Sequence, residues 1–265
     1  MLIRKKIQTE VTGMFKKFLS RIGVGGATIN LELDRSLIQM GEPVTGSIIV
    51  QGGEVEQEIN EITVQFRVDS RYAHDERTYE VNEIVATMPP LEPFMIASKE
   101  RKIFPFTMKI PDHIAISSLT TQYYFSTNLD IAEAIDAFDR DYIDVLPSGL
   151  MKNFHEGLKL LGCRIKAEAF TGKYQFFNFE PTTWLRGKLD ELVFHLEPAN
   201  SKTSISGHFE VDRKTSGIIG KMFDKMDLDE IKGFYRFTDA QLATPEKAAE
   251  SIKNFVENIY NDLHH

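Results

Sequence analysis

The stretch GEPVTGSIIVQGGEVEQEINEITVQF, residues 41–66, decides the fold of this 265-residue chain. Polar and apolar residues alternate over residues 44–50 and again over residues 62–68, on either side of Gly52 and Gly53. A period of two is typical of a β-strand that turns one face to a core and the other to water. We expect the glycine pair to adopt positive φ and to let the chain reverse between two strands.

The same alternation recurs in TINLELD, KIFPFTMKIP and YYFSTNLDI, which begin at Thr28, Lys102 and Tyr123. Antiparallel sheets allow strands with one wet face, whereas parallel sheets covered on both faces do not. Because no helices alternate with these strands, the pattern predicts an all-β fold built as a β-sandwich. Pro105 lies inside one of the runs and lacks an N–H group, so we expect it at an edge or a bulge.

A second β-rich unit is predicted after the break VLPSG, residues 145–149. Phe154, Leu158 and Leu161 indicate a short helix, and SGIIGKMFDKM reads as a helical insert further on. Strands are expected near residues 163–170, 173–180, 190–197, 203–211 and 233–238. A final helix begins with Thr244 as its N-cap and Pro245 at its first position. That helix either packs on the second unit or pairs with its counterpart in a homodimer.

The first 27 residues predict an amphipathic helix that the glycine-rich segment GVGGA ends. Its apolar residues recur at helical spacing, at Val11, Met14, Phe15, Phe18, Leu19 and Ile22. Residues 1–23 hold six lysines and arginines and one glutamate, a formal charge of +5. Such a stripe can pack on the protein's own core, bind in a partner's groove, or lie on an anionic membrane. The candidate partner or membrane contacts are Phe15, Lys16, Lys17, Phe18 and Arg21.

The domain organisation that we expect has four parts. An amphipathic N-terminal helix occupies residues 1–27, and a first β-sandwich occupies residues 28–146. A second β-sandwich follows over residues 150–240, and a C-terminal helix ends the chain at residues 244–265. The helices are expected to lie at the periphery of the two sandwiches.

Several of these motifs together resemble the bacterial sporulation-control (SpoOM-like) family of arrestin-like proteins. They are FKKFLSRIGVGGATINLELD, the 41–66 stretch, FPFTMKIP, LDIAEAIDAFDRDYIDVLP, FHEGLKLLGCRIKAEAF, RGKLDELVFHLEP and GHFEVDRKTSGIIGKMFDKMDLDE. The likeness extends over roughly residues 14–231. It implies two tandem immunoglobulin-like sandwiches and a role in regulating sporulation or related stages of the cell cycle through protein partners. It brings no catalytic residues with it.

Composition narrows the function classes further. The net charge of −8 argues against nucleic acid as a partner, because phosphate binding needs a basic surface. The single cysteine, Cys163, excludes an internal disulfide framework and a site of several thiolates for zinc. We find no signal peptide and no apolar run long enough to span a membrane, so we expect a cytoplasmic protein that could still associate with a membrane surface.

Candidate chemistry is sparse. The acidic run DIAEAIDAFDRDYID could bind a hard cation or form a solvated turn in which Arg140 pairs with a carboxylate, and its spacing lacks the EF-hand signature. Cys163 is expected to be buried and unreactive. His195 and His208 lie in alternating strands and could face each other, without the spacing of a zinc helix. We therefore assign no catalytic residue, no cofactor and no metal ligand.

The function that we expect is a non-enzymatic regulatory scaffold that binds protein partners at a sheet edge, in the groove between the two sandwiches, or through the terminal helix. One alternative is a membrane-peripheral trafficking adaptor that uses the basic N-terminal helix. A second alternative is a metal-dependent enzyme, which requires several of the clustered aspartates to converge.

Overall fold

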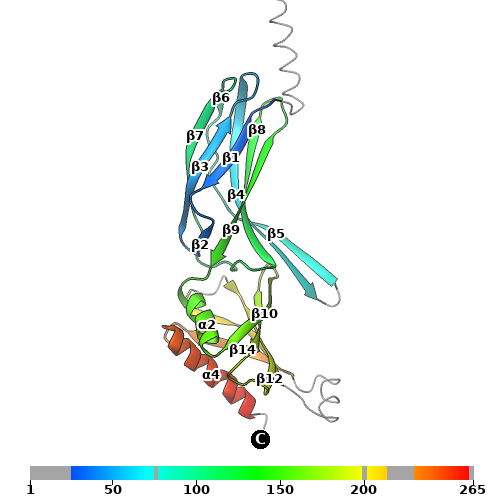
Figure 1. Cartoon of the computed structure of the whole chain (residues 1–265), viewed down its shortest axis with the longest axis vertical. Helices are drawn as coiled ribbons and strands as arrows, with labels where there is room; N and C mark the ends of the chain where they lie inside the picture. The colour runs from blue at the N-terminus through cyan, green and yellow to red at the C-terminus, as the bar shows by residue number, and fades with distance from the viewer. Residues whose placement is uncertain (1–24, 75–76, 199–201, 214–229, 263–265) are drawn as a thin grey trace, which may run out of the picture.

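The computed structural model describes residues 25–74, 77–198, 202–213 and 230–262. These residues form two β-rich units stacked end to end (Figure 1). The predicted N-terminal helix and the SGIIGKMFDKM insert lie outside the described residues. The all-β class with flanking helices is confirmed.

The first unit is a sandwich of two sheets. The smaller sheet has the order β1-β3-β7, from strands β1 (Thr28–Leu33), β3 (Pro43–Gln51) and β7 (Arg101–Lys109). The larger sheet has the order β2-β9-β8-β4-β5, from β2 (Leu37–Gln39), β9 (Ala137–Leu146), β8 (Thr121–Ile131), β4 (Gln57–His74) and β5 (Arg77–Thr87), with β6 (Phe94–Ile96) paired to β4. Alternate residues of each strand fill the space between the sheets, as the period of two predicts. Pro105 lies in β7, an edge strand, as predicted.

Gly52 and Gly53 have a different role from the predicted one. Neither residue has positive φ, and the chain does not make a hairpin there, because β3 and β4 belong to opposite sheets. Both glycines are buried, and a Cβ would lie 2.2 Å from the Ala97 carbonyl oxygen at Gly52 and 2.1 Å from the Gly25 carbonyl oxygen at Gly53. The pair is therefore required by the close approach of two other backbone segments where the chain crosses between sheets.

The second unit is one five-stranded antiparallel sheet covered on one face by helices. Its strands follow chain order: β10 (Cys163–Phe170), β11 (Gln175–Pro181), β12 (Leu189–Leu196), β13 (Ser204–Arg213) and β14 (Glu230–Thr238). The helices α2 (Gly149–Leu160) and α4 (Pro245–Asp262) pack against each other (Figure 1). The sequence predicted a β-sandwich here, with a second sheet facing the first. The helices α2 and α4 occupy the place of that second sheet, because their apolar stripes cover the inner face of the five-stranded sheet.

The contact between α2 and α4 is close because Gly157 faces Ala248. A Cβ at Gly157 would lie 2.8 Å from the Ala248 Cβ. The predicted N-cap is present, since the Lys247 N–H donates to the Thr244 Oγ1 at 3.3 Å. Ile252 and Val256 follow Ala248 on the same face of α4 and are buried. The C-terminal helix therefore packs on its own unit, which is one of the two roles expected for it.

Candidate functional site

Buried hydrogen bonds join the two units at their junction. The Gln175 side chain, from the start of β11, accepts from the Ile116 N–H at 2.8 Å and donates to the Ile116 carbonyl oxygen at 2.9 Å. The Phe170 N–H donates to the Ser70 Oγ at 3.1 Å, and that oxygen lies 3.0 Å from the Thr121 Oγ1. Buried polar groups of this kind require their partners, so they fix how the units meet.

A second layer of contacts lies nearer the surface of the junction. The Thr120 hydroxyl donates to the Glu168 carbonyl oxygen at 2.7 Å, and the Leu119 N–H donates to the Glu168 carboxylate at 3.2 Å. Burial raises the pKa of Glu168, while hydrogen bonds from Ser118 and Leu119 act in the opposite direction. The loop before β8 is thus attached to β10 of the second unit.

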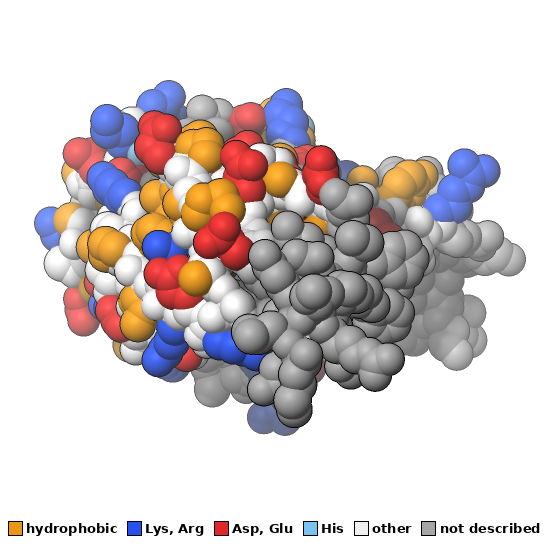
Figure 2. Space-filling view, turned by 90° about the horizontal axis from the view of Figure 1, so that it is seen from above, with side chains coloured by type: hydrophobic (Ala, Val, Ile, Leu, Met, Phe, Trp, Pro, Cys, Tyr) orange, Lys and Arg blue, Asp and Glu red, His pale blue; other side chains and the backbone are white. Residues whose placement is uncertain are grey.

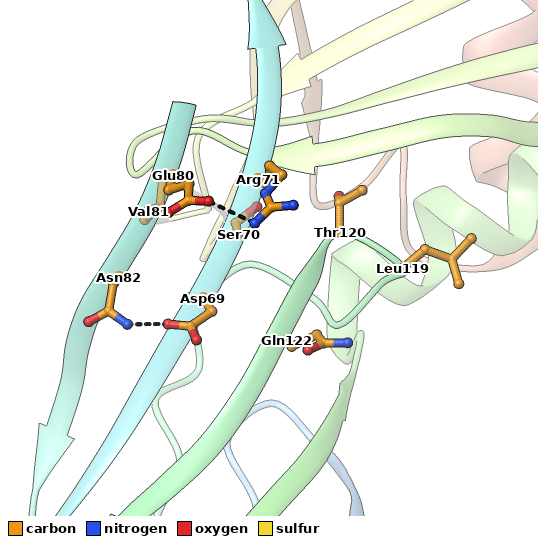
Figure 3. A pocket seen from close by; sticks show the side chains of 9 residues that line it. All are labelled: Asp69, Ser70, Arg71, Glu80, Val81, Asn82, Leu119, Thr120 and Gln122. Atoms are coloured by element: carbon orange, nitrogen blue, oxygen red, sulfur yellow. Dashed lines mark hydrogen bonds and ion pairs between the residues drawn. The ribbon is translucent and has the colours of Figure 1, made fainter. Parts of the chain in front are cut away.

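An open cleft of about 530 Å³ lies beside this junction (Figure 3). Its lining comes from the consecutive strands β4 and β5 and, about forty residues further along the chain, from the start of β8 and the loop that leads into it. The lining residues are Asp69, Ser70, Arg71, Glu80, Val81, Asn82, Leu119, Thr120 and Gln122. The antiparallel pairing of β4 with β5 places Arg71 opposite Glu80 and Asp69 opposite Asn82.

The polar groups of the cleft form cross-strand pairs. The Arg71 guanidinium lies 2.7 Å from the Glu80 carboxylate in an exposed ion pair, and the Asn82 amide donates to Asp69. Tyr124 adds a third member, because its hydroxyl donates to Asp69 at 3.3 Å and accepts from Asn82 at 3.2 Å. The cleft therefore presents fixed donors and acceptors of both charges.

Leu119 gives the cleft an apolar contact point. Its side chain is 95% exposed, although it is large and aliphatic. Histidine and cysteine are absent from the nine lining residues. An exposed aliphatic side chain beside ordered polar groups is suited to binding a peptide segment, in which the apolar contact supplies affinity and the polar pairs supply orientation.

The five contact residues predicted from the sequence, Phe15, Lys16, Lys17, Phe18 and Arg21, lie outside the described residues and remain predictions. Sequence reasoning proposed a groove between the units but identified none of its residues. The available signal was the length of the alternating pattern through residues 57–74, which exceeds the usual strand length. A strand that long must extend beyond its sandwich.

The acidic run is divided among separate positions. Asp130 accepts from the Asn60 side chain at 3.1 Å, and Asp136 accepts from the Ile131 N–H at 3.3 Å. Asp139 accepts from the Leu31 N–H of β1 at 2.7 Å. Arg140 lies over the Tyr124 ring, 4.3 Å from its centroid, and the Tyr142 side chain and the Asp69 carboxylate are among the groups that raise its pKa. Within the described ranges, no three His, Cys, Asp or Glu side chains converge as metal ligands would.

Two partly buried residues with enclosed polar atoms, His155 and Asp141, give stability opposite dependences on pH. His155 of α2 packs against the Phe177 ring, and burial lowers its pKa to about 4. The unfolded histidine titrates near 6.5, so the unfolded chain binds more protons, and the stability from this group is lost as pH falls from about 6.5 to about 4. For Asp141, burial first and Asp139 second raise the pKa to about 7. The folded chain then holds the extra proton, so this contribution is lost as pH rises from about 4 to about 7.

We expect the two contributions to offset each other in the wild-type protein and to separate in variants. Asp141→Asn leaves the histidine contribution, so acidification below about pH 6.5 lowers the free energy of unfolding more steeply than in the wild type. His155→Leu leaves the aspartate contribution and gives the opposite change. Urea unfolding followed by circular dichroism across this pH range measures both, and three parallel stability curves would contradict the assignment.

The remaining candidates are placed as the sequence suggested. Cys163 is buried, and desolvation raises the pKa of its thiol to about 11. His195 and His208 are directly opposite each other on β12 and β13. Desolvation lowers the pKa of His195, and the Glu210 carboxylate at 3.4 Å opposes that shift.

Among the described residues, no helix is both long and apolar enough to cross a membrane.

Comparisons with known proteins agree with this architecture. A curated relative from Bacillus subtilis (strain 168), "Sporulation-control protein spo0M", is 28% identical over 255 residues, which are 92% of this chain and 97% of the relative. The crystal structure of Spo0M from Bacillus subtilis shares the fold with a TM-score of 0.70 at 24% identity, covering 90% of this chain and 99% of that one. The family model described as SpoOM protein matches residues 15–215, and the chain therefore belongs to the SpoOM protein family.

Proposed function

We propose that this protein is a non-enzymatic regulatory adaptor of the cytoplasm that acts in sporulation, or in a related step of cell-cycle or developmental control, by binding protein partners. Membership of the SpoOM family and the name of the Bacillus relative support the regulatory part of the proposal. The junction cleft supports the binding part, and it is the observation that carries the mechanism.

In this mechanism an extended partner segment lies in the junction cleft. Its apolar side chain covers Leu119, and its polar groups bind at the Arg71–Glu80 and Asp69–Asn82 pairs. The neighbouring edge favours an extended conformation, because β5 ends the larger sheet and no described strand pairs with its outer side. A strand added there would gain main-chain hydrogen bonds. Binding of this kind requires no catalytic group.

The test uses two substitutions on the surface of the cleft, Leu119→Asp and Arg71→Glu. Leu119→Asp removes the apolar contact, and Arg71→Glu sets two carboxylates opposite each other. Both side chains are exposed, so we expect stability to fall by no more than about 1 kcal/mol, most of it from the opposed carboxylates of Arg71→Glu. In a strain of the native host that lacks the gene, both variants should fail to restore the wild-type developmental phenotype. Leu160→Asp on α2, where the leucine is 59% exposed, is the matched control and should restore it.

A photo-crosslinking residue at position 119 provides the direct measurement. We expect it to trap a discrete protein partner in cells, and we expect the Arg71→Glu substitution to abolish that product. The same residue at position 160 should not trap this partner. If Leu119→Asp and Arg71→Glu both restore the phenotype and position 119 yields no specific product, the cleft is not the binding site.

A further inference from the structure

The end of the first sandwich remote from the junction carries a second unusual surface. Strands β3 and β8 end here, and β1, β4, β7 and β9 begin here, as their registers show. Seen from above, hydrophobic side chains and carboxylates are interspersed on this end of the molecule (Figure 2). Ile135 is 57% exposed and Phe138 is 70% exposed. We call the residues Glu61, Asp130, Glu133, Ile135, Asp136 and Phe138 the distal patch.

The register of the strands places the main members of the distal patch on one face. Phe138 of β9 lies opposite Asn128 of β8, and Asp130 follows Asn128 by two residues, so both point outward. Asp130 in turn lies directly opposite Glu61 of β4. Like charges opposite each other destabilise a sheet. The distal patch therefore favours a ligand that combines cationic groups with an apolar face.

The chain itself supplies such a ligand at this position. The Gly25 carbonyl oxygen accepts from the Glu54 N–H at 2.8 Å, so residues 1–24 join the fold at this end. Six residues further on, the Leu31 N–H donates to Asp139, the neighbour of Phe138. Since a strand rises about 3.3 Å per residue, Gly25 lies within roughly 20 Å of the distal patch.

We infer that residues 1–24 of this chain bind the distal patch. Their sequence combines an apolar stripe with a formal charge of +5 over residues 1–23, which complements four carboxylates around two exposed apolar side chains. A short tether gives an effective concentration on the order of 1 mM, which favours this segment over a separate partner. The same stripe is the part that an anionic membrane would bind, so the distal patch and a membrane compete for it.

Limited trypsin digestion of the full-length protein tests the inference, because Lys16, Lys17 and Arg21 are cleavage sites. Phe138→Asp and Phe18→Ser should each speed removal of the N-terminal segment by about tenfold, and added salt should act in the same direction. Phe18 belongs to the N-terminal segment and not to residues 28–146 of the first sandwich, so Phe18→Ser decides the matter if Phe138→Asp unfolds the protein. Phe234→Asp is the control, because Phe234 is 77% exposed on the second unit. Equal cleavage rates in all four proteins would overturn the inference.

Sedimentation with vesicles of anionic phospholipid separates the membrane outcome. We expect Phe138→Asp to increase vesicle binding, because the N-terminal segment is released from the distal patch. Phe18→Ser should bind vesicles no better than the wild type, since it loses part of the apolar stripe. Equal vesicle binding by the wild type and Phe138→Asp would mean that the distal patch does not hold the segment, and it would overturn the inference.

Discussion

Replacing Gln175 with leucine is expected to lower the free energy of unfolding by about 2–4 kcal/mol and to loosen the junction between the two units. Leucine is similar in size but can neither accept from nor donate to the Ile116 backbone. Both Ile116 backbone groups would then be buried without partners, and each such group costs about 1–3 kcal/mol. The buried hydrogen bond from the Phe170 N–H to the Ser70 hydroxyl would still join the two units.

Urea unfolding measures the stability change, and small-angle X-ray scattering measures the spread of molecular dimensions. Gln122→Leu is the matched control, because it makes the same chemical change at an exposed position of β8 in the first unit. We expect the control to behave as the wild type. Unchanged stability and unchanged scattering of Gln175→Leu would mean that other contacts hold the units together.

The second large effect is expected for Phe154→Ala in the core of the second unit. The Phe154 ring is fully buried and packs edge-on against Phe194 at 5.2 Å, with Phe237 at 6.1 Å and Tyr235 at 6.4 Å between centroids. Truncation removes the side chain that joins α2 to β12 and β14 and leaves a cavity. The cost should be about 3–5 kcal/mol.

Trp184 is a convenient probe for this variant, because it is the only tryptophan and its indole N–H donates to Glu257 of α4 at 3.0 Å. Denaturant unfolding followed by its fluorescence should shift strongly for Phe154→Ala. Leu160→Ala, on the exposed side of the same helix, should leave the free energy of unfolding within about 0.5 kcal/mol of the wild-type value. Equal shifts in the two variants would show that the effect comes from helix propensity and not from the core.

Local patterns in the sequence predicted the parts of the fold that depend on neighbouring residues. Alternation identified the strands, Thr244 and Pro245 marked the start of α4, and the surroundings of Cys163 predicted a buried thiol. Such patterns state which face of an element is buried. They do not state what covers it, which is why α2 and α4 occupy the place expected for a second sheet.

A groove between the units was predicted, but the residues that form the junction and its cleft could not be, because they depend on contacts between distant residues. Ser70 meets Phe170 across one hundred positions, and Gln175 meets Ile116 across fifty-nine. The same limit explains the error at Gly52 and Gly53. A glycine pair in sequence does not distinguish positive φ from a lack of space, and here Ala97 and Gly25 remove the space.

The buried thiol of Cys163 has a practical consequence for work on this protein. Thiol-directed dyes and spin labels react with the thiolate, and burial raises the pKa of this thiol to about 11 and shields its sulfur. A cysteine introduced on the surface would therefore be labelled selectively without removal of the native one. Pairs of labels, one on each unit, would then report distances across the whole molecule by fluorescence energy transfer.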